Sequence, residues 1–327
     1  MADVKHRTMI GGQAVIEGVM MKGVKSTAMA VRKPDGSINL DIWENTSVKD
    51  KYPVLKWPIL RGVVNFVEML VFGYKSLMAS AEISGIEDEA EETAEAGNAK
   101  EENIENAESK KKEEEKPGAA MVAIEWGSIL LGLAIAVVLF SIAPAFLIKY
   151  TFARLNFGPF LNTLAEGVVR ITIFVIYLFA ISRLKDIKRV YEYHGAEHKT
   201  IYCYEHGEEL TKENARKYTR FHPRCGTSFL LIVLVVSILV FSILHVTWSI
   251  LWLRILIKVA LLPVIVGISY EIIKFAGRHD NSVMRFILAP GLWMQRLTTR
   301  EPDDSQLEVA IKSLQAVLTG SPEDDKW

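Results

Sequence analysis

Four apolar stretches constrain the fold of this chain more than any other feature of its sequence. Each is rich in Leu, Ile, Val and Phe and runs for about 20 residues, the length of helix that crosses a hydrocarbon core about 30 Å thick. The stretches are residues 124–148, 160–181, 228–246 and 251–273. The sequence therefore predicts a mainly α fold, a polytopic membrane protein with about four transmembrane helices.

Basic residues in the connecting segments set the expected orientation, because short loops rich in Lys and Arg stay in the cytoplasm. The loop at 182–227 is the most basic of these connections. An even number of spans then places both termini in the cytoplasm of a multi-pass protein of the bacterial cell membrane. The opening residues lack the apolar core of a removable signal peptide, so we expect the mature chain to start at Met1.

The segments before the first apolar stretch predict smaller elements. Residues 1–50 hold short apolar runs around Pro-Asp-Gly at 34–36, a turn signal that indicates a small cytoplasmic β element. Residues 51–85 repeat apolar side chains at helical spacing, and three charges interrupt that repeat, so we expect an amphipathic helix in the membrane interface. A fifth span is the alternative, and burying a central Arg or Lys would cost it roughly 2.5–3.5 kcal/mol. The charges are Arg61, Glu68 and Lys75.

The rest of the chain divides by charge and hydropathy. Residues 86–118 are dominated by Glu, Lys, Ala and Asn and almost lack large apolar side chains, so this segment predicts a disordered charged linker. Residues 119–275 form the predicted four-span membrane domain, with the cytoplasmic loop at 182–227. Residues 276–327 predict an interfacial helix and then an amphipathic cytoplasmic helix that ends near Gly320.

The basic loop contains an H-x-x-E-H pattern, formed by His194, Glu197 and His198. Residues four apart share one face of a helix, so both imidazoles can be directed at one metal ion. The glutamate beside them could accept a proton from a metal-bound water, as in inverted zinc-protease motifs. We therefore expect His194 and His198 as ligands of a divalent metal, with zinc favoured, and Glu197 as the catalytic base.

A second pair of candidate ligands lies just before the third apolar stretch. His222 and Cys225 form an H-x-x-C pattern, and a two-residue gap lets neighbouring ligands reach the same ion. Together with the two histidines of the first motif they would make a tetrahedral set. Four protein ligands are typical of a structural zinc site, whereas three ligands plus water are typical of a catalytic one. The sequence leaves both readings open.

Glu271 is a further candidate ligand near the cytoplasmic end of the last apolar stretch. An ionisable residue inside a span points to function by default, but Glu271 could equally pair with Lys274. The cysteines, Cys203 and Cys225, both fall in the loop assigned to the cytoplasm, so no structural disulfide is expected. No nucleotide-binding or serine-hydrolase motif is present, and membrane topology already explains the basic loop, so nucleic-acid binding has no support.

Several longer motifs resemble the YqhQ-like family of bacterial membrane proteins, an uncharacterised group predicted to be metal-dependent enzymes. The resemblance covers most of the chain. It implies membrane location and a metal, and it implies no substrate. The motifs that carry it are GGQAVIEGVMMKG, KWPILRGVVNFVE, YHGAEHKTI, FHPRCGTSFLLIV, SYEII and PGLWMQRLTTREPDD.

These observations favour a metal-dependent membrane enzyme, a hydrolase acting on a lipid or a membrane-associated peptide. The alternative is a non-enzymatic scaffold or assembly factor in which the same ligands hold a structural metal. A transporter is the third reading, disfavoured because no paired broken helices are evident. Membrane lipid is the expected partner, nucleic acid is not expected, and a homo-oligomer stays open.

Overall fold

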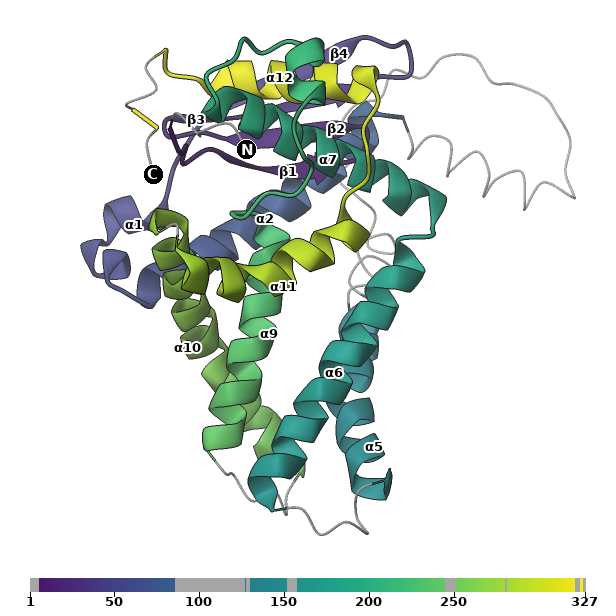
Figure 1. Ribbon diagram of the computed structural model, residues 1–327, viewed down its shortest axis with the longest axis vertical. Coiled ribbons are helices and arrows are strands. Elements are labelled where there is room, and N and C mark those ends of the chain that lie inside the picture. The colour runs from purple at the N-terminus through teal and green to yellow at the C-terminus, as the bar shows by residue number, and fades with distance from the viewer. Residues whose placement is uncertain are drawn as a thin grey trace, which may run out of the picture. The chain divides into compact units, whose positions relative to one another are not determined.

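The computed structural model describes residues 6–85, 127, 130–151, 158–244, 251–279, 281–320 and 324–325. The chain forms two compact units, one comprising Met1–Asp88 with Val175–Trp327 and the other Glu89–Phe174. The described residues are mainly helical, with one small sheet near the N-terminus (Figure 1). The predicted linker at 86–118 lies outside the described residues, as do parts of the apolar stretches at 124–148 and 228–246.

The N-terminal segment confirms the predicted β element, as a four-stranded antiparallel meander. Its strands follow one another in chain order: β1 (Gly11–Val15), β2 (Gly18–Lys22), β3 (Ser26–Arg32) and β4 (Ile38–Glu44). The turn between β3 and β4 is the Pro-Asp-Gly signal, in which Gly36 has φ of 83° and the Asp35 carboxylate accepts from the Ser37 N–H at 2.8 Å. A left-handed φ is accessible to glycine without steric cost, which fixes the hairpin here.

Successive side chains along each strand point to opposite faces of the sheet. Helices pack on both faces. Toward one face point Val19, Met21, Ala28 and Ala30, all buried against α7 (Lys185–Glu205) and α12 (Asp304–Val317). Toward the other point Val15, Met20, Met29 and Val31, which pack near the end of α2 (Leu60–Ile83). A capping box between Asp303 and Gln306 starts α12.

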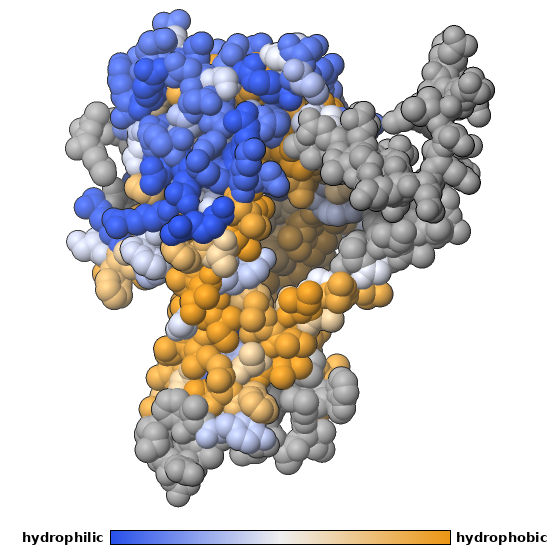
Figure 2. Space-filling model, turned by 90° about the vertical axis from the view of Figure 1, so that its right-hand side faces the viewer, coloured by the Kyte–Doolittle hydropathy of each residue, from blue (hydrophilic) through white to orange (hydrophobic). Residues whose placement is uncertain are grey.

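Among the described residues, five helices are long and apolar enough to cross a membrane, one more than the four expected. Four of them correspond to the predicted spans: residues 130–148, α6 (Pro159–Ile181), α9 (Gly226–Ile243) and α10 (Leu251–Arg278). The fifth is α2. The first of the four includes a π-helical turn, η2 (Val138–Ile142), and continues into α5 (Ala143–Thr151). In Figure 2, hydrophobic residues cover the long helices and hydrophilic residues gather over the sheet and its helices.

Helix α2 connects the helices α9 and α10 to the sheet. In its first half Gly62 lies directly against Tyr270 of α10, where an added Cβ would be 2.7 Å from that side chain, and Phe66 packs on Phe229 of α9. In its second half Ser76 donates to the Met20 sulfur, and Ser80 accepts from the Ile16 N–H. The helix therefore passes from the ends of α9 and α10 to the underside of the sheet (Figure 1).

The shorter helices complete the unit that contains the sheet. Helix α11 (Ser282–Thr298) packs on α9 and exposes Phe286 and Trp293 on its free side. Between β4 and α2 lie α1 (Val48–Lys51) and the 3-10 turn η1 (Pro53–Lys56), and α8 (Lys212–Arg216) follows α7. The two helices predicted within residues 276–327 thus correspond to α11 and α12.

The unit formed by Glu89–Phe174 contains a buried ion pair that sequence reasoning passed over. Arg170 and Glu166 lie one turn apart on α6, with the guanidinium donating to the carboxylate at 2.9 Å. Arg170 Nε also donates to the Phe140 carbonyl, within the π-helical turn, at 2.7 Å. Two charges four residues apart in a predicted span were the available signal.

Candidate metal centre

The H-x-x-E-H motif lies in the middle of α7, within the segment 193–201, where every residue is buried. Gly195, inside the motif, weakens the helix by about 1 kcal/mol relative to alanine. Its presence has a steric reason: a Cβ at this position would lie 2.0 Å from the carbonyl oxygen of Arg300. The Arg300 N–H donates to the Tyr191 carbonyl at 2.8 Å, so the chain after α11 runs directly against the motif.

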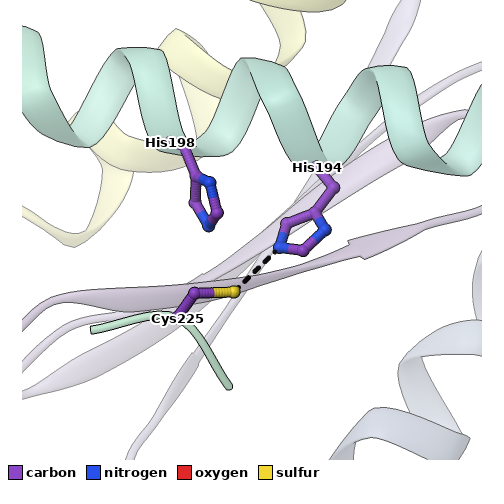
Figure 3. Close-up of side chains that lie close together, drawn as sticks. All are labelled: His194, His198 and Cys225. Atoms are coloured by element: carbon purple, nitrogen blue, oxygen red, sulfur yellow. Dashed lines mark hydrogen bonds between the residues drawn. The ribbon is translucent and has the colours of Figure 1, made fainter. Parts of the chain in front are cut away.

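His194, His198 and Cys225 converge on one point (Figure 3). One ligand atom from each residue lies within 4.8 Å of the other two, and His194 Nε2 is 3.2 Å from Cys225 Sγ. All three side chains are less than one-tenth exposed, at 9%, 1% and 7%. Cys225 is the N-cap of α9, and its sulfur accepts from the Thr227 N–H at 3.4 Å. The start of one apolar helix thus delivers the thiol to the motif on α7.

Backbone carbonyls orient both imidazole rings. His194 Nδ1 donates to the Thr298 carbonyl at 2.8 Å, and His198 Nδ1 donates to the Arg220 carbonyl at 2.5 Å. Because carbonyl oxygens only accept, each ring carries a proton on Nδ1 and directs Nε2 toward the cluster. His198 Nε2 is buried and has no hydrogen-bond partner among the described residues. Such anchoring of the second ring nitrogen is typical of metal-ligating histidines.

Charges within the cluster favour a thiolate. Burial alone would raise the pKa of Cys225, but His194 and His198 outweigh it and hold the pKa of the thiol well below its usual range. Burial likewise opposes the charged form of His194, and the Cys225 thiolate overcomes this and raises the pKa of His194 to about 9. A thiolate is the form of cysteine that binds metal ions.

Glu197 lies beside the cluster, between α7 and β1. An added Cβ on Gly12 would be 2.9 Å from the Glu197 carboxyl carbon, so β1 approaches this carboxylate closely. Its Oε2 atom is buried and has no hydrogen-bond partner among the described residues. Burial raises the pKa of Glu197 above its ordinary value, although His194 and His198 act in the opposite direction.

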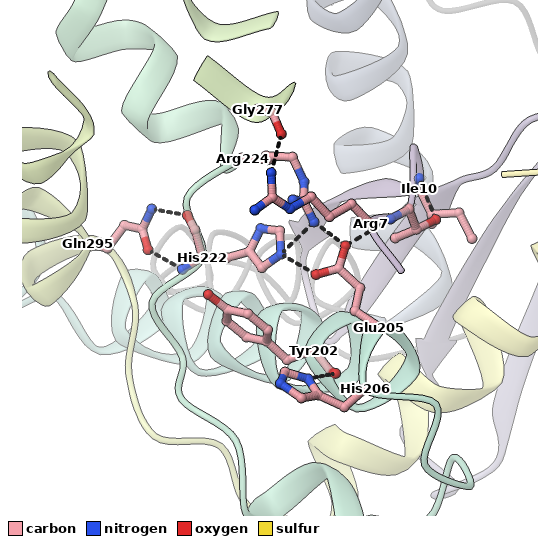
Figure 4. Close-up of polar contacts among 10 residues, drawn as sticks. Arg7, Ile10, Tyr202, Glu205, His206, His222, Arg224, Gly277 and Gln295 are labelled. Atoms are coloured by element: carbon pink, nitrogen blue, oxygen red, sulfur yellow. Dashed lines mark hydrogen bonds and ion pairs between the residues drawn. The ribbon is translucent and has the colours of Figure 1, made fainter. Parts of the chain in front are cut away.

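His222 is not brought into the close set and belongs instead to a neighbouring buried network (Figure 4). Its Nε2 lies 3.4 Å from Glu205, a carboxylate that also accepts from Arg224 and, at 2.9 Å, from the Thr8 N–H. Gln295 holds the His222 backbone, accepting from its N–H and donating to its carbonyl, both at 2.7 Å. Burial, with the charge of Arg224, lowers the pKa of His222 to about 4, so the ring is neutral at pH 7.

Glu271 is also not brought to the cluster. It forms a bidentate ion pair with Arg61, at 2.7 Å for the Nε bond, which joins α10 to the start of α2. Lys274, the alternative partner considered from sequence, contributes only a weaker electrostatic attraction. In the structure Glu271 therefore lies in an ion pair between two helices.

Sequence reasoning missed the residues that shape the centre from a distance. The Thr298 and Arg220 carbonyls carry no side-chain signal, and the approach of Gly12 depends on how β1 packs. Glu205 was also missed, although it lies seven residues after His198, two turns further along the buried face of α7. That spacing was the signal available for it.

Comparison with known proteins agrees with the resemblance in the motifs. The model of the family described as "Protein of unknown function (DUF1385)" matches residues 57–320. The chain is also similar to "Uncharacterized protein YqhQ" of Bacillus subtilis (strain 168), with 36% identity over 320 residues that cover 94% of this chain and 92% of the relative. No solved structure matches it. The match over most of both chains shows that this protein belongs to the DUF1385 family.

Proposed function

We propose that this protein is a metal-dependent membrane enzyme, a hydrolase, whose centre is formed by His194, His198 and Cys225. The observation that supports this proposal most directly is the orientation of the two histidines. A backbone carbonyl holds Nδ1 of each ring, and each ring directs Nε2 toward the same buried sulfur. A divalent ion would take the place of the proton between His194 and Cys225. Two imidazoles and a thiolate suit zinc.

The number of converging ligands supports catalysis. A closed structural zinc site needs four protein ligands, whereas catalytic sites use three and keep one position for water or substrate. The structure groups three, and the two further candidates are engaged elsewhere: His222 with Glu205 and Glu271 with Arg61.

Glu197 is the proposed general base. Its buried Oε2 has no hydrogen-bond partner among the described residues, the charges of His194 and His198 act on this carboxylate, and a raised pKa makes it a stronger proton acceptor. A bound divalent ion would supply Lewis-acid activation of water and of the scissile bond. Glu197 would then hold the proton that leaves water and deliver it to the leaving group.

The apolar helices support a membrane location. Surfaces of this extent and hydropathy are unstable in water. The basic residues of the loop at 182–227 favour the cytoplasmic side for this loop, for the metal centre and for both termini. Helix α2 leaves the ends of α9 and α10 for the sheet, and α11 exposes Phe286 and Trp293; both features support an interfacial position for these helices. A lipid or a membrane-associated peptide is the proposed substrate.

A structural metal site in a scaffold protein is the second candidate. The observation that favours it is burial, because all three ligands are nearly inaccessible and a substrate would need a path to them. In this case the ion would hold α7 against the start of α9, with His222 or Glu197 completing the shell.

Elemental analysis of the detergent-purified chain tests the proposal. We expect about one zinc per chain in the wild type, loss of metal from His194→Ala/His198→Ala, and retention in His279→Ala, which alters an exposed histidine. X-ray absorption then counts the ligands: three protein ligands plus a light oxygen support the enzyme, and four protein ligands support the scaffold. Folded wild-type protein that takes up no metal on titration contradicts both.

A further inference from the structure

A cationic pocket of about 330 Å³ opens where α6 ends, α7 begins and α11 ends. Residues from all three elements line it, together with the chain that follows α11. Four of its seven lining residues are cationic and none is a carboxylate. The cationic residues are Arg183, Lys188, Arg296 and Arg300.

These cations are poorly neutralised. Among the described residues, the Arg300 guanidinium donates one hydrogen bond, to the Ser182 carbonyl at 3.3 Å, and its Nε is buried without a partner. Arg183 lies over the Phe179 ring at 4.5 Å, a contact that leaves its N–H groups available. Within the described part of the chain Arg296 has no ion-pair partner, and Lys188 meets only Glu192, at 3.7 Å on the exposed surface.

A second pocket, larger than the cationic one, gives a useful contrast. It has a volume of about 410 Å³ and is also lined by lysines, but Asp50 and Glu68 line it as well. There Lys56 pairs with Asp50 at 3.2 Å, so part of the positive charge is neutralised internally. The pocket at the end of α6 has no such internal anion and is therefore the stronger site for an external one.

Phe179 lines the cationic pocket, and two further exposed apolar side chains lie close in sequence to its lining residues. Phe179 lies at the end of an apolar helix, Leu184 follows it, and Trp293 lies one turn before Arg296 on α11. About half of each of these apolar side chains is exposed, at 48%, 57% and 52%. A ligand held here would meet guanidinium groups at one end and apolar surface at the other.

We propose that this pocket binds the phosphate of an anionic membrane lipid, with Arg183, Arg296 and Arg300 as its main ligands. Guanidinium groups match the oxygens of a phosphate in pairs, and the cytoplasmic leaflet supplies anionic lipids. The pocket is a second site, because none of the residues of the metal centre lines it. The proposal therefore stands or falls independently of the metal.

Native mass spectrometry of the full chain in dodecyl maltoside tests the site, with dioleoylphosphatidylglycerol as the anionic probe and dioleoylphosphatidylcholine as the zwitterionic one. We expect the anionic lipid to bind the wild type, and Arg183→Gln/Arg296→Gln to weaken it about 30-fold, since each cation near the leaflet contributes about 1 kcal/mol. The matched control, Lys22→Gln/Lys56→Gln, removes the same charge from the larger pocket and should leave binding unchanged.

Each outcome decides the question. Equal binding by the wild type and the arginine variant overturns the proposal, and so does an equal loss in the lysine control, which would indicate general charge attraction. Inorganic phosphate that displaces the lipid at micromolar concentration would show a free phosphate site and contradict the lipid. If the double variant melts at a lower temperature than the wild type, the single variant Arg296→Gln is used instead. This side chain is exposed and has no ion-pair partner among the described residues, so its replacement should not disturb the fold. We expect it to weaken binding of the anionic lipid about fivefold.

Discussion

The carbonyl oxygen of Arg300 occupies the space that a side chain on Gly195 would need, 2.0 Å from the position of an added Cβ. This contact lets the chain after α11 lie against α7, where the Thr298 carbonyl two residues earlier accepts from His194. The orientation of His194, a proposed metal ligand, thus depends on the next residue, Gly195, having no side chain.

Gly195→Ala should therefore damage the centre although alanine favours a helix. The clash is with backbone, which cannot rotate away, so we expect a loss of about 1–3 kcal/mol in stability that exceeds the gain of about 1 kcal/mol in helix propensity. Zinc content and melting temperature in detergent should both fall. Gly132→Ala, on a helix where an added Cβ meets nothing within 4 Å, is the control and should melt at or above the wild-type temperature.

The two cysteines should differ in their effect on metal content. Cys225→Ser replaces a thiolate at the centre with a hydroxyl, a far weaker zinc ligand, and should lower bound zinc well below one per chain. Cys203 is buried elsewhere on α7, where burial raises the pKa of its thiol to about 11, so Cys203→Ser should keep its zinc. Equal zinc in both variants would remove Cys225 from the ligand set.

Glu271→Gln separates the ion pair from metal binding. The variant should keep its full zinc content, because the carboxylate pairs with Arg61, and it should lose about 1 kcal/mol in stability at this partly exposed position. Arg61→Gln should give a similar loss of stability. If Glu271→Gln lost zinc and Arg61→Gln did not, Glu271 would be a metal ligand.

Glu205→Gln should destabilise the protein by about 3–5 kcal/mol, because it removes the carboxylate charge that pairs with the buried Arg224 guanidinium. Burial opposes the charge of Glu205, but the hydrogen bond from His222 and the charge of Arg224 lower its pKa below the ordinary value. Its charge therefore stabilises the fold at neutral pH, and this contribution is lost as the pH falls through the folded-state pKa.

Thermal melting across pH tests the Glu205 prediction. The difference in melting temperature between wild type and Glu205→Gln should be largest near pH 7. It should shrink only as the pH falls below the ordinary range of a glutamate and through the lowered folded-state pKa, where the wild-type carboxylate becomes protonated. Glu208→Gln removes an exposed carboxylate paired with Lys217 and should change the melting temperature little. A difference for Glu205→Gln that does not depend on pH would contradict the argument.

The sequence determined the features that depend on local spacing. Apolar residues in runs of about 20 predicted the long helices, and the Pro-Asp-Gly turn predicted the hairpin between β3 and β4. The four-residue separation of His194 and His198 predicted two imidazoles on one helical face. Each of these follows from the geometry of a few neighbouring residues, which the sequence alone fixes.

Only the tertiary structure decided which distant residues meet at the centre. Three further residues were candidate ligands: Cys225, His222 and Glu271. The packing of α9 on the rest of the fold brings Cys225 to the centre, whereas His222 contacts Glu205 and Glu271 pairs with Arg61. The carbonyls of Thr298 and Arg220 complete the centre and have no signature in their side chains. Such contacts join residues between 22 and 104 positions apart, so they depend on how whole helices pack, which local periodicity does not specify.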